Sequence, residues 1–174
     1  ERIAAAAATM NTMISEILYA NVRRRCPASE VLEYTLSQLS ALSWKGIVTV
    51  RPFPGEGGPV IHVNLVRLSR ALMNLLDNAR RATEGTDSPK VTLETRIGDR
   101  VVEFEVTDNG PGFGPRGGGE KSGWGSTGIG LAFVREVSDA HGGTLSFRDL
   151  PGGGAAVCIS LPLDKAGGKT EAQP

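Results

Sequence analysis

An amphipathic segment from Asn64 to about Thr83 constrains the fold more than any other part of the chain. Its apolar residues recur at spacings of three and four, which predicts a helix with one buried face. They are Leu65, Leu68, Leu72, Leu75, Leu76 and Ala79. Such a face needs a surface to cover it, and a chain of 174 residues is long enough to form one domain with a substantial core.

Alternating segments supply the surface that this helix covers. The sequence predicts two β-hairpins, one over residues 91–96 and 101–107 and one over 144–147 and 155–161. Other expected elements are a strand at 47–50, a short apolar segment at 60–63, and helices at 29–45 and 131–140. Helices that alternate with antiparallel hairpins predict an α/β fold, a two-layer α/β sandwich with its helices on one face of a mixed sheet.

The first part of the chain predicts an N-terminal helical extension. Residues 1–25 hold an alanine run and then a Met and Ile stripe, which is typical of an amphipathic helix. The chain begins at Glu1 within this pattern, so we expect it to be a fragment of a longer protein. Ser29 is the predicted N-cap of the next helix. The expected division is a partial helix over 1–25, a main domain over 26–163 and a disordered tail over 164–174.

Composition excludes several classes of protein. Lysine and arginine number 19, as do aspartate and glutamate, so no basic footprint indicates nucleic acid or contact with an anionic membrane. No apolar run approaches the roughly 20 residues of a membrane span. The two cysteines lie far apart, which argues against a disulfide scaffold or a metal site and favours a cytoplasmic location. Whether the parent protein is membrane-anchored stays open.

Three segments carry residues suited to binding a nucleotide. Asn74 and Asn78 lie four residues apart and therefore on one helix face, where amide oxygens suit Mg²⁺ that bridges to phosphates. Arg81 follows and can reach a phosphate. The alternative reading of this segment is a polar stripe on an amphipathic helix. Two asparagines alone do not define a metal site.

The other two segments are glycine-rich loops. Asp108 ends a predicted strand, where its carboxylate can accept a hydrogen bond from the exocyclic amine of a purine, and the following glycines permit close approach. A tight structural loop is the alternative. Residues 123–131 lead into a helix whose first backbone N–H groups can bind phosphate oxygens. Each of the three segments also fits an ordinary structural role, and it is their ordered set that favours nucleotide binding.

These three segments resemble the N box and the two glycine boxes of the GHKL ATP-binding superfamily. The matching stretches are Asn-Leu-Leu-Asp-Asn-Ala from Asn74, Asp-Asn-Gly-Pro-Gly-Phe-Gly from Asp108, and Gly-Ser-Thr-Gly-Ile-Gly-Leu from Gly125. The trailing His141-Gly142-Gly143 resembles sensor histidine kinases in particular, and the likeness covers about residues 46–163. It implies a Bergerat-type ATP-binding fold with ATP and Mg²⁺ as ligands.

The resemblance also implies a role for each site residue. Asn78 would hold Mg²⁺ with help from Asn74, Arg81 would contact phosphate, and Asp108 would bind the adenine amine. Gly110 and Gly112 would shape the adenine pocket. The phosphates would lie on the loop that contains Thr127, Gly128, Ile129, Gly130 and Leu131.

Asn74 separates a kinase from an ATPase within this superfamily. The ATPases resemble one another in having a glutamate at this position as general base, and an amide cannot accept that proton. The resemblance therefore implies transfer of the γ-phosphate to a histidine, with a degenerate nucleotide-binding scaffold or, less favoured, a GHKL ATPase as alternatives. His62 and His141 are both expected to be structural, so the acceptor is expected to be absent from this chain.

The implied partners follow from the same likeness. Residues 1–25 resemble the end of the second helix of a dimerisation and histidine-phosphotransfer hairpin, whose first helix would carry the acceptor. The second partner would be the receiver domain of a response regulator. Three departures from the pattern stand out. Ala82 lies where an aromatic residue or histidine is common, and Arg81 lies where lysine is common. The third is a short lid in which Lys121 and Trp124 either contact the nucleotide or form an inert loop.

Overall fold

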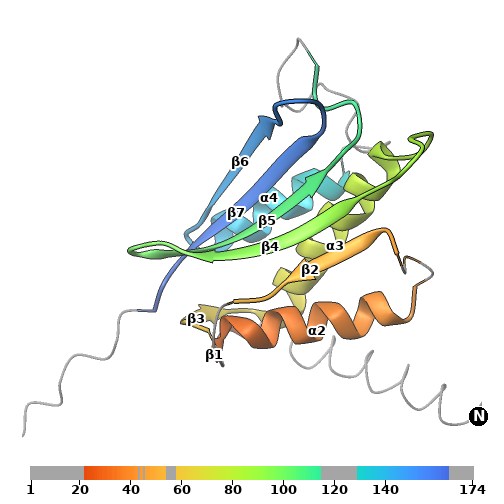
Figure 1. Ribbon diagram of the computed structural model, residues 1–174. Coiled ribbons are helices and arrows are strands. Elements are labelled where there is room, and N and C mark those ends of the chain that lie inside the picture. The colour runs from red at the N-terminus through yellow and green to blue at the C-terminus, as the bar shows by residue number, and fades with distance from the viewer. Residues whose placement is uncertain (1–21, 43, 45, 54–57, 115–128, 165–174) are drawn as a thin grey trace, which may run out of the picture.

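The computed structural model describes residues 22–42, 44, 46–53, 58–114 and 129–164. These described residues form strands and three helices, which are arranged in two layers (Figure 1). In chain order they are β1 (Arg24–Pro27), α2 (Ala28–Ser40), β2 (Val48–Arg51), β3 (Val60–Val63), α3 (Leu65–Ala82), β4 (Val91–Ile97), β5 (Val101–Asp108), α4 (Ile129–Ala140), β6 (Thr144–Asp149) and β7 (Ala155–Pro162).

The main sheet has five strands in the order β2-β4-β5-β7-β6. Strand β2 pairs with β4 in parallel and every other pair in this sheet is antiparallel, so the sheet is mixed. The three helices lie on one of its faces, with α3 packed between α2 and α4 (Figure 1). The predicted α/β fold and both predicted hairpins are confirmed.

The core forms where the buried face of α3 meets the sheet. Leu68, Leu72 and Leu75 on the helix, with Phe104 on β5 and Ile159 on β7, are fully buried. Each such side chain contributes about 2 kcal/mol on burial. This core fixes α3 against the ends of β4 and β5, and so determines where the polar face of α3 lies.

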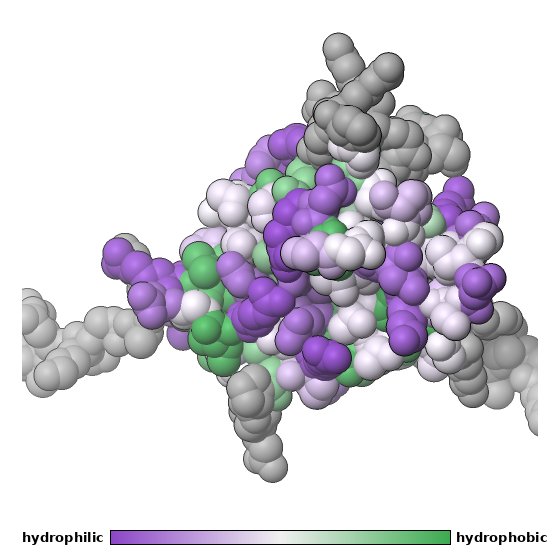
Figure 2. Space-filling model, turned by 45° about the horizontal axis from the view of Figure 1, so that its top comes forward, coloured by the Kyte–Doolittle hydropathy of each residue, from purple (hydrophilic) through white to green (hydrophobic). Residues whose placement is uncertain are grey.

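The opposite face of the sheet carries charged side chains. Figure 2 shows hydrophilic residues spread over one face of the molecule, with hydrophobic residues in small separate patches. Glu105 on β5 is buried between two arginines, with Arg96 Nη2 at 2.6 Å and Arg148 Nη2 at 2.8 Å from its carboxylate oxygens. Both oxygens therefore have a charged partner, as a buried carboxylate requires.

The structure corrects two boundaries near the N-terminus. Strand β1 begins at Arg24, inside the range predicted as helix, because residues 24–27 pair with β3 and bury Cys26. Ser29 does not cap α2. The helix begins at Ala28, whose N–H donates to the Pro59 carbonyl oxygen at 2.8 Å. Residues 1–21 and 165–174 lie outside the described residues.

Helix α2 also ends earlier than predicted, at Ser40 and not near Lys45. The hydroxyl of Ser37 donates to the carbonyl oxygen of Tyr34, and that of Ser40 to the carbonyl oxygen of Ser37, at 2.7 Å each. Hydroxyl groups that bind carbonyl oxygens three residues back compete with the regular helical pattern. The helical periodicity of the sequence therefore overestimated the length of this helix.

His141 joins the end of α4 to the start of α3. Its Nε2 accepts a hydrogen bond from the Asn64 N–H at 2.9 Å, so Nδ1 carries the proton and donates to the Val137 carbonyl oxygen at 2.6 Å. Burial lowers the pKa of His141, with a smaller opposing effect of the Val137 carbonyl. Both ring nitrogens are engaged in a buried position, which is the structural role expected for this histidine.

Candidate nucleotide-binding site

The two asparagines of α3 lie beside the first turn of α4. A Cβ placed on Gly130 would lie 3.5 Å from Asn74 Oδ1, so the start of α4 approaches α3 at this residue. One turn away, Asn78 Nδ2 is buried and has no hydrogen-bond partner among the described residues. An unsatisfied buried amide is costly unless a ligand completes its hydrogen bonds. This face of α3 is therefore suited to a polar ligand.

Arg81 lies on the same side of the helix and is held by a neighbouring carboxylate. Its Nε is 2.9 Å from Asp77 Oδ2, and the other oxygen of Asp77 accepts from Arg80. The guanidinium carbon of Arg80 also lies over the Trp44 ring, 5.5 Å from its centre, and Arg80 forms an ion pair with Glu84. The half-exposed Arg81 guanidinium thus lies at the edge of the asparagine face, where a phosphate could meet it.

Asp108 is the most unusual carboxylate of the site. It ends β5 and is 4% exposed. Its Oδ1 accepts a hydrogen bond from the Gly110 N–H at 2.8 Å, whereas Oδ2 is buried without a hydrogen-bond partner in the described part of the chain. Burial raises the pKa of Asp108, and the backbone amides of Gly110 and Ala155 partly offset this effect. The free oxygen is an acceptor that an amino group of a ligand can satisfy.

The loop after Asp108 packs on the last turn of α3. A Cβ at Gly110 would lie 2.5 Å from the Ala82 carbonyl oxygen, so a side chain there would separate the loop from the helix. Gly112 has φ +76°, and a Cβ on it would lie 2.6 Å from Asp149 Oδ1. These glycines are required by close packing of the loop, which places Asp108 beside the C-terminal end of α3.

Strand β6 anchors the loop after Asp108 through Asp149 and Phe147, whose role the sequence did not predict. The Phe113 N–H donates to Asp149 Oδ1 at 2.6 Å. The Phe113 ring makes an edge-to-face contact with the Phe147 ring, with the ring centres 5.8 Å apart. Gly154, in the turn between β6 and β7, lies directly against the carbonyl of Asp108. The run of glycines from Gly152 was a signal for this approach, but it equally fits an ordinary hairpin turn.

The glycine-rich loop before α4 is described only from Ile129. Helix α4 begins there, two residues before the predicted Leu131, so Ile129, Gly130 and Leu131 form its first turn. Ile129 is exposed and Gly130 adjoins Asn74. Lys121, Trp124, Thr127 and Gly128 lie outside the described residues. The positive end of α4 therefore lies at the asparagine face, as phosphate binding requires.

The donor set fits Mg²⁺ that shares its ligands with a nucleotide. Among the described residues no group of three or more histidines, cysteines or acidic residues is placed to hold a metal ion. Mg²⁺ typically takes few protein ligands and completes its shell with waters and phosphate oxygens. Asn78, whose amide has an oxygen for a metal and a nitrogen for a phosphate, suits that arrangement.

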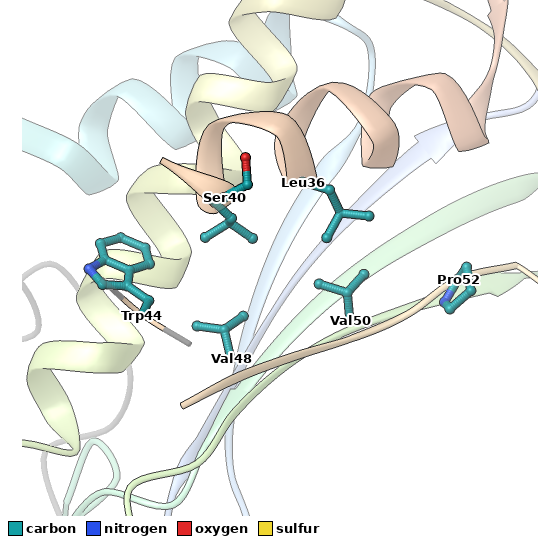
Figure 3. Close-up of a pocket in the computed structure, with 7 residues that line it drawn as sticks. Leu36, Ser40, Trp44, Val48, Val50 and Pro52 are labelled. Atoms are coloured by element: carbon teal, nitrogen blue, oxygen red, sulfur yellow. The ribbon is translucent and has the colours of Figure 1, made fainter. Parts of the chain in front are cut away.

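An apolar groove of about 440 Å³ lies elsewhere, between α2 and β2. Its walls include Leu36 and Ser40 of α2, Trp44, and Val48 and Val50 of β2 (Figure 3). None of the described residues that line it is charged, and this apolar lining does not suit a triphosphate. It is separated from the asparagine face by α3, since α2 and α4 flank that helix on opposite sides.

Residues 63–165 match the protein family described as "Histidine kinase-, DNA gyrase B-, and HSP90-like ATPase". The chain belongs to this family, and its ATP-binding domain is of the kind found in histidine kinases. It is similar to the ATP-binding domain of PrrB from Mycobacterium tuberculosis, with 26% identity, a TM-score of 0.65 and coverage of 82% of this chain and 98% of that one. A mycobacterial sensor histidine kinase, MprB, gives 28% identity, a TM-score of 0.62 and the same coverage.

Curated relatives include a sensor protein and a sensor protein kinase. The chain is 36% identical over 108 residues to the sensor protein kinase CarS of Pseudomonas aeruginosa, covering 58% of this chain and 23% of that protein. It is 31% identical over 117 residues to the sensor protein KdpD of Escherichia coli K12, covering 62% of this chain and 13% of that protein. The chain thus spans less than a quarter of the length of either relative. Among the helices that the structure describes, none combines the length and apolar composition of a membrane span.

Proposed function

We propose that this domain binds ATP with Mg²⁺ and transfers the γ-phosphate to a histidine on a helical hairpin of the parent protein, as part of a two-component signalling kinase. The observation that carries the proposal is the pair of unsatisfied buried polar atoms, Asp108 Oδ2 and Asn78 Nδ2. Asn78 lies on α3, and the loop after Asp108 packs on the last turn of the same helix. Asp108 Oδ2 would accept from the adenine amine. Asn78, with Asn74, would meet the phosphates and Mg²⁺.

The chemistry follows from what these residues can and cannot do. Mg²⁺, when bound, would neutralise phosphate charge, and the amides of α3 would fix the triphosphate against the start of α4. Asn74 and Asn78 have no group that accepts a proton from water, which disfavours hydrolysis by a general base at this position. A histidine imidazole attacks without such a base, since its free nitrogen is nucleophilic at neutral pH.

Asn78→Ala is expected to weaken Mg²⁺-ATP binding by about ten- to a hundredfold, because a hydrogen bond to a charged group contributes roughly 1.5–3 kcal/mol. Calorimetric titration with ATP measures the affinity, and the ATP-dependent rise in melting temperature provides a second readout. Addition of EDTA should lower wild-type affinity and change the variant less. Equal ATP affinity in the two proteins would contradict the assignment of Asn78.

Transfer to histidine requires the hairpin. The present chain with radiolabelled ATP should show no stable label, and the same chain extended to include its upstream hairpin should become labelled with the lability to acid that phosphohistidine has. Replacement of the hairpin histidine by glutamine should abolish the label. Rapid phosphate release by the present chain alone would instead favour an ATPase. Subsequent loss of label to a receiver domain would identify the response regulator.

A further inference from the structure

Two arginines continue the polar face of α3 beyond Asn74. Arg70 precedes Asn74 by four residues, as Asn74 precedes Asn78, so the three side chains lie on one side of the helix. Arg67 lies about one turn further towards the N-terminal end of α3. Four residues correspond to a rise of about 6 Å, which an arginine side chain spans easily. The face therefore carries positive charge next to the predicted phosphate site.

Phe133 of α4 holds both guanidinium groups. The Arg70 guanidinium carbon is 5.4 Å from the centre of the Phe133 ring, and that of Arg67 is 5.8 Å from it. A cation stacked on an aromatic face in this way is weakly but specifically oriented. Both arginines of α3 are thus held against α4 by a contact that leaves their charge available to a ligand.

The two arginines differ in their ion pairs. Arg67 Nη2 is 2.5 Å from Glu136 Oε1, so its charge is compensated. Arg70 is exposed and forms no ion pair with another described residue. Arg80 and Arg81, near the other end of the helix, are both paired with Asp77. Arg70 is therefore the α3 arginine whose charge the described carboxylates leave uncompensated.

The positions at which the Asp108 loop and the start of α4 contact α3 indicate which part of a bound nucleotide would lie near Arg70. Asp108 is the predicted acceptor for the adenine amine, and the neighbouring Gly110 packs against Ala82 at the end of α3. The start of α4 approaches α3 at Asn74. Asn74 is about 12 Å and Arg70 about 18 Å from Ala82 along the helix axis. A nucleotide with its base at Asp108 and its phosphates along α3 would direct its last phosphate towards Arg70.

We propose that Arg70 binds the terminal phosphate of ATP and so makes the site prefer ATP over ADP. The proposal rests on the proposed function. A guanidinium binds a phosphate with two parallel hydrogen bonds, and one that is already oriented by a ring loses little freedom on doing so. ADP ends one phosphate short of Arg70, so the contribution of this residue is confined to the triphosphate.

Calorimetric titrations of Arg70→Ala with Mg²⁺-ATP and Mg²⁺-ADP test the proposal. We expect the affinity for ATP to fall about tenfold and that for ADP to change less than about twofold. Phe133→Leu should lower the ATP affinity by about threefold, because it removes the ring that orients the guanidinium. Arg67→Ala is the matched control, one turn away on the same ring but already ion-paired, and should leave both affinities within about twofold.

The outcomes separate this inference from the proposed function. If Arg70→Ala lost affinity for ATP and ADP equally, or lost none for either, the proposed role of Arg70 would be wrong. ATP binding by the wild-type protein would still support the proposed function. An absence of ATP binding by the wild-type protein would overturn both. Melting temperatures without nucleotide show that the variants are folded, and Arg70→Lys, which keeps the charge but not the planar fork, should recover part of the ATP affinity.

Discussion

Gly154→Ala is expected to destabilise the domain by about 3–5 kcal/mol, the largest effect of any single methyl group at this site. Gly154 has φ +99°, a conformation that residues with a side chain rarely adopt. A Cβ there would lie 2.0 Å from the Asp108 carbonyl oxygen and 3.1 Å from the Asn109 Cα. The obstacle is backbone, so it cannot rotate away as a flexible side chain would. Either the β6–β7 turn or the end of β5 must move.

Gly152→Ala is the control for this prediction. Gly152 lies in the same turn with φ +92°, but a Cβ on it would meet nothing within 4 Å. Its replacement should therefore cost the conformational strain alone, about 1–2 kcal/mol. Urea unfolding of both variants measures the difference. If the two variants were equally stable, contact between the turn and Asp108 would not matter to the fold. We also expect Gly154→Ala to lose ATP affinity, since Asp108 moves with its carbonyl.

Local patterns were sufficient to predict much of this fold. The apolar spacing of α3 and the alternation of β4 and β5 depend on neighbours within each segment, and both were predicted nearly to the residue. Strand β1 was not, because residues 24–27 become a strand only by pairing with β3, far along the chain. The same limit explains Ser29, which lies inside the helix because α2 already begins at Ala28, whose N–H donates to the distant Pro59 carbonyl oxygen.

In the candidate site, too, some residues could be predicted from local sequence, and others depend on contacts with distant segments. The asparagine pair and Asp108 carry chemistry that is visible in their residue types and spacing. Asp149, Gly154 and Phe133 matter through what they touch, and each touches a segment that is distant in sequence. An aspartate at a strand end or a phenylalanine on a helix gives no local sign of such a contact. The residues that position a site are therefore harder to predict than the residues that form it.

Asp108→Asn is expected to lower ATP affinity roughly a hundredfold without destabilising the nucleotide-free domain. The side-chain oxygen of the asparagine would still accept from the Gly110 N–H, as Asp108 Oδ1 does at 2.8 Å. Its NH₂ group would then replace Oδ2 and oppose the adenine amine, donor against donor. Guanine has a carbonyl oxygen at that position, so the ratio of ATP to GTP affinity should fall in Asp108→Asn.

The pH dependence follows from the raised pKa of Asp108. In an acid whose pKa is higher in the folded than in the unfolded state, ionisation costs folding stability as the pH rises through the folded-state pKa. Asp108→Asn removes that cost, so its melting temperature at neutral pH should equal or exceed that of the wild type. As the pH is lowered towards the raised pKa, wild-type ATP affinity should fall because the protonated carboxyl is a poorer acceptor. Asp108→Asn should lack this component, and parallel pH profiles for the two proteins would show that adenine binding does not depend on the Asp108 carboxylate.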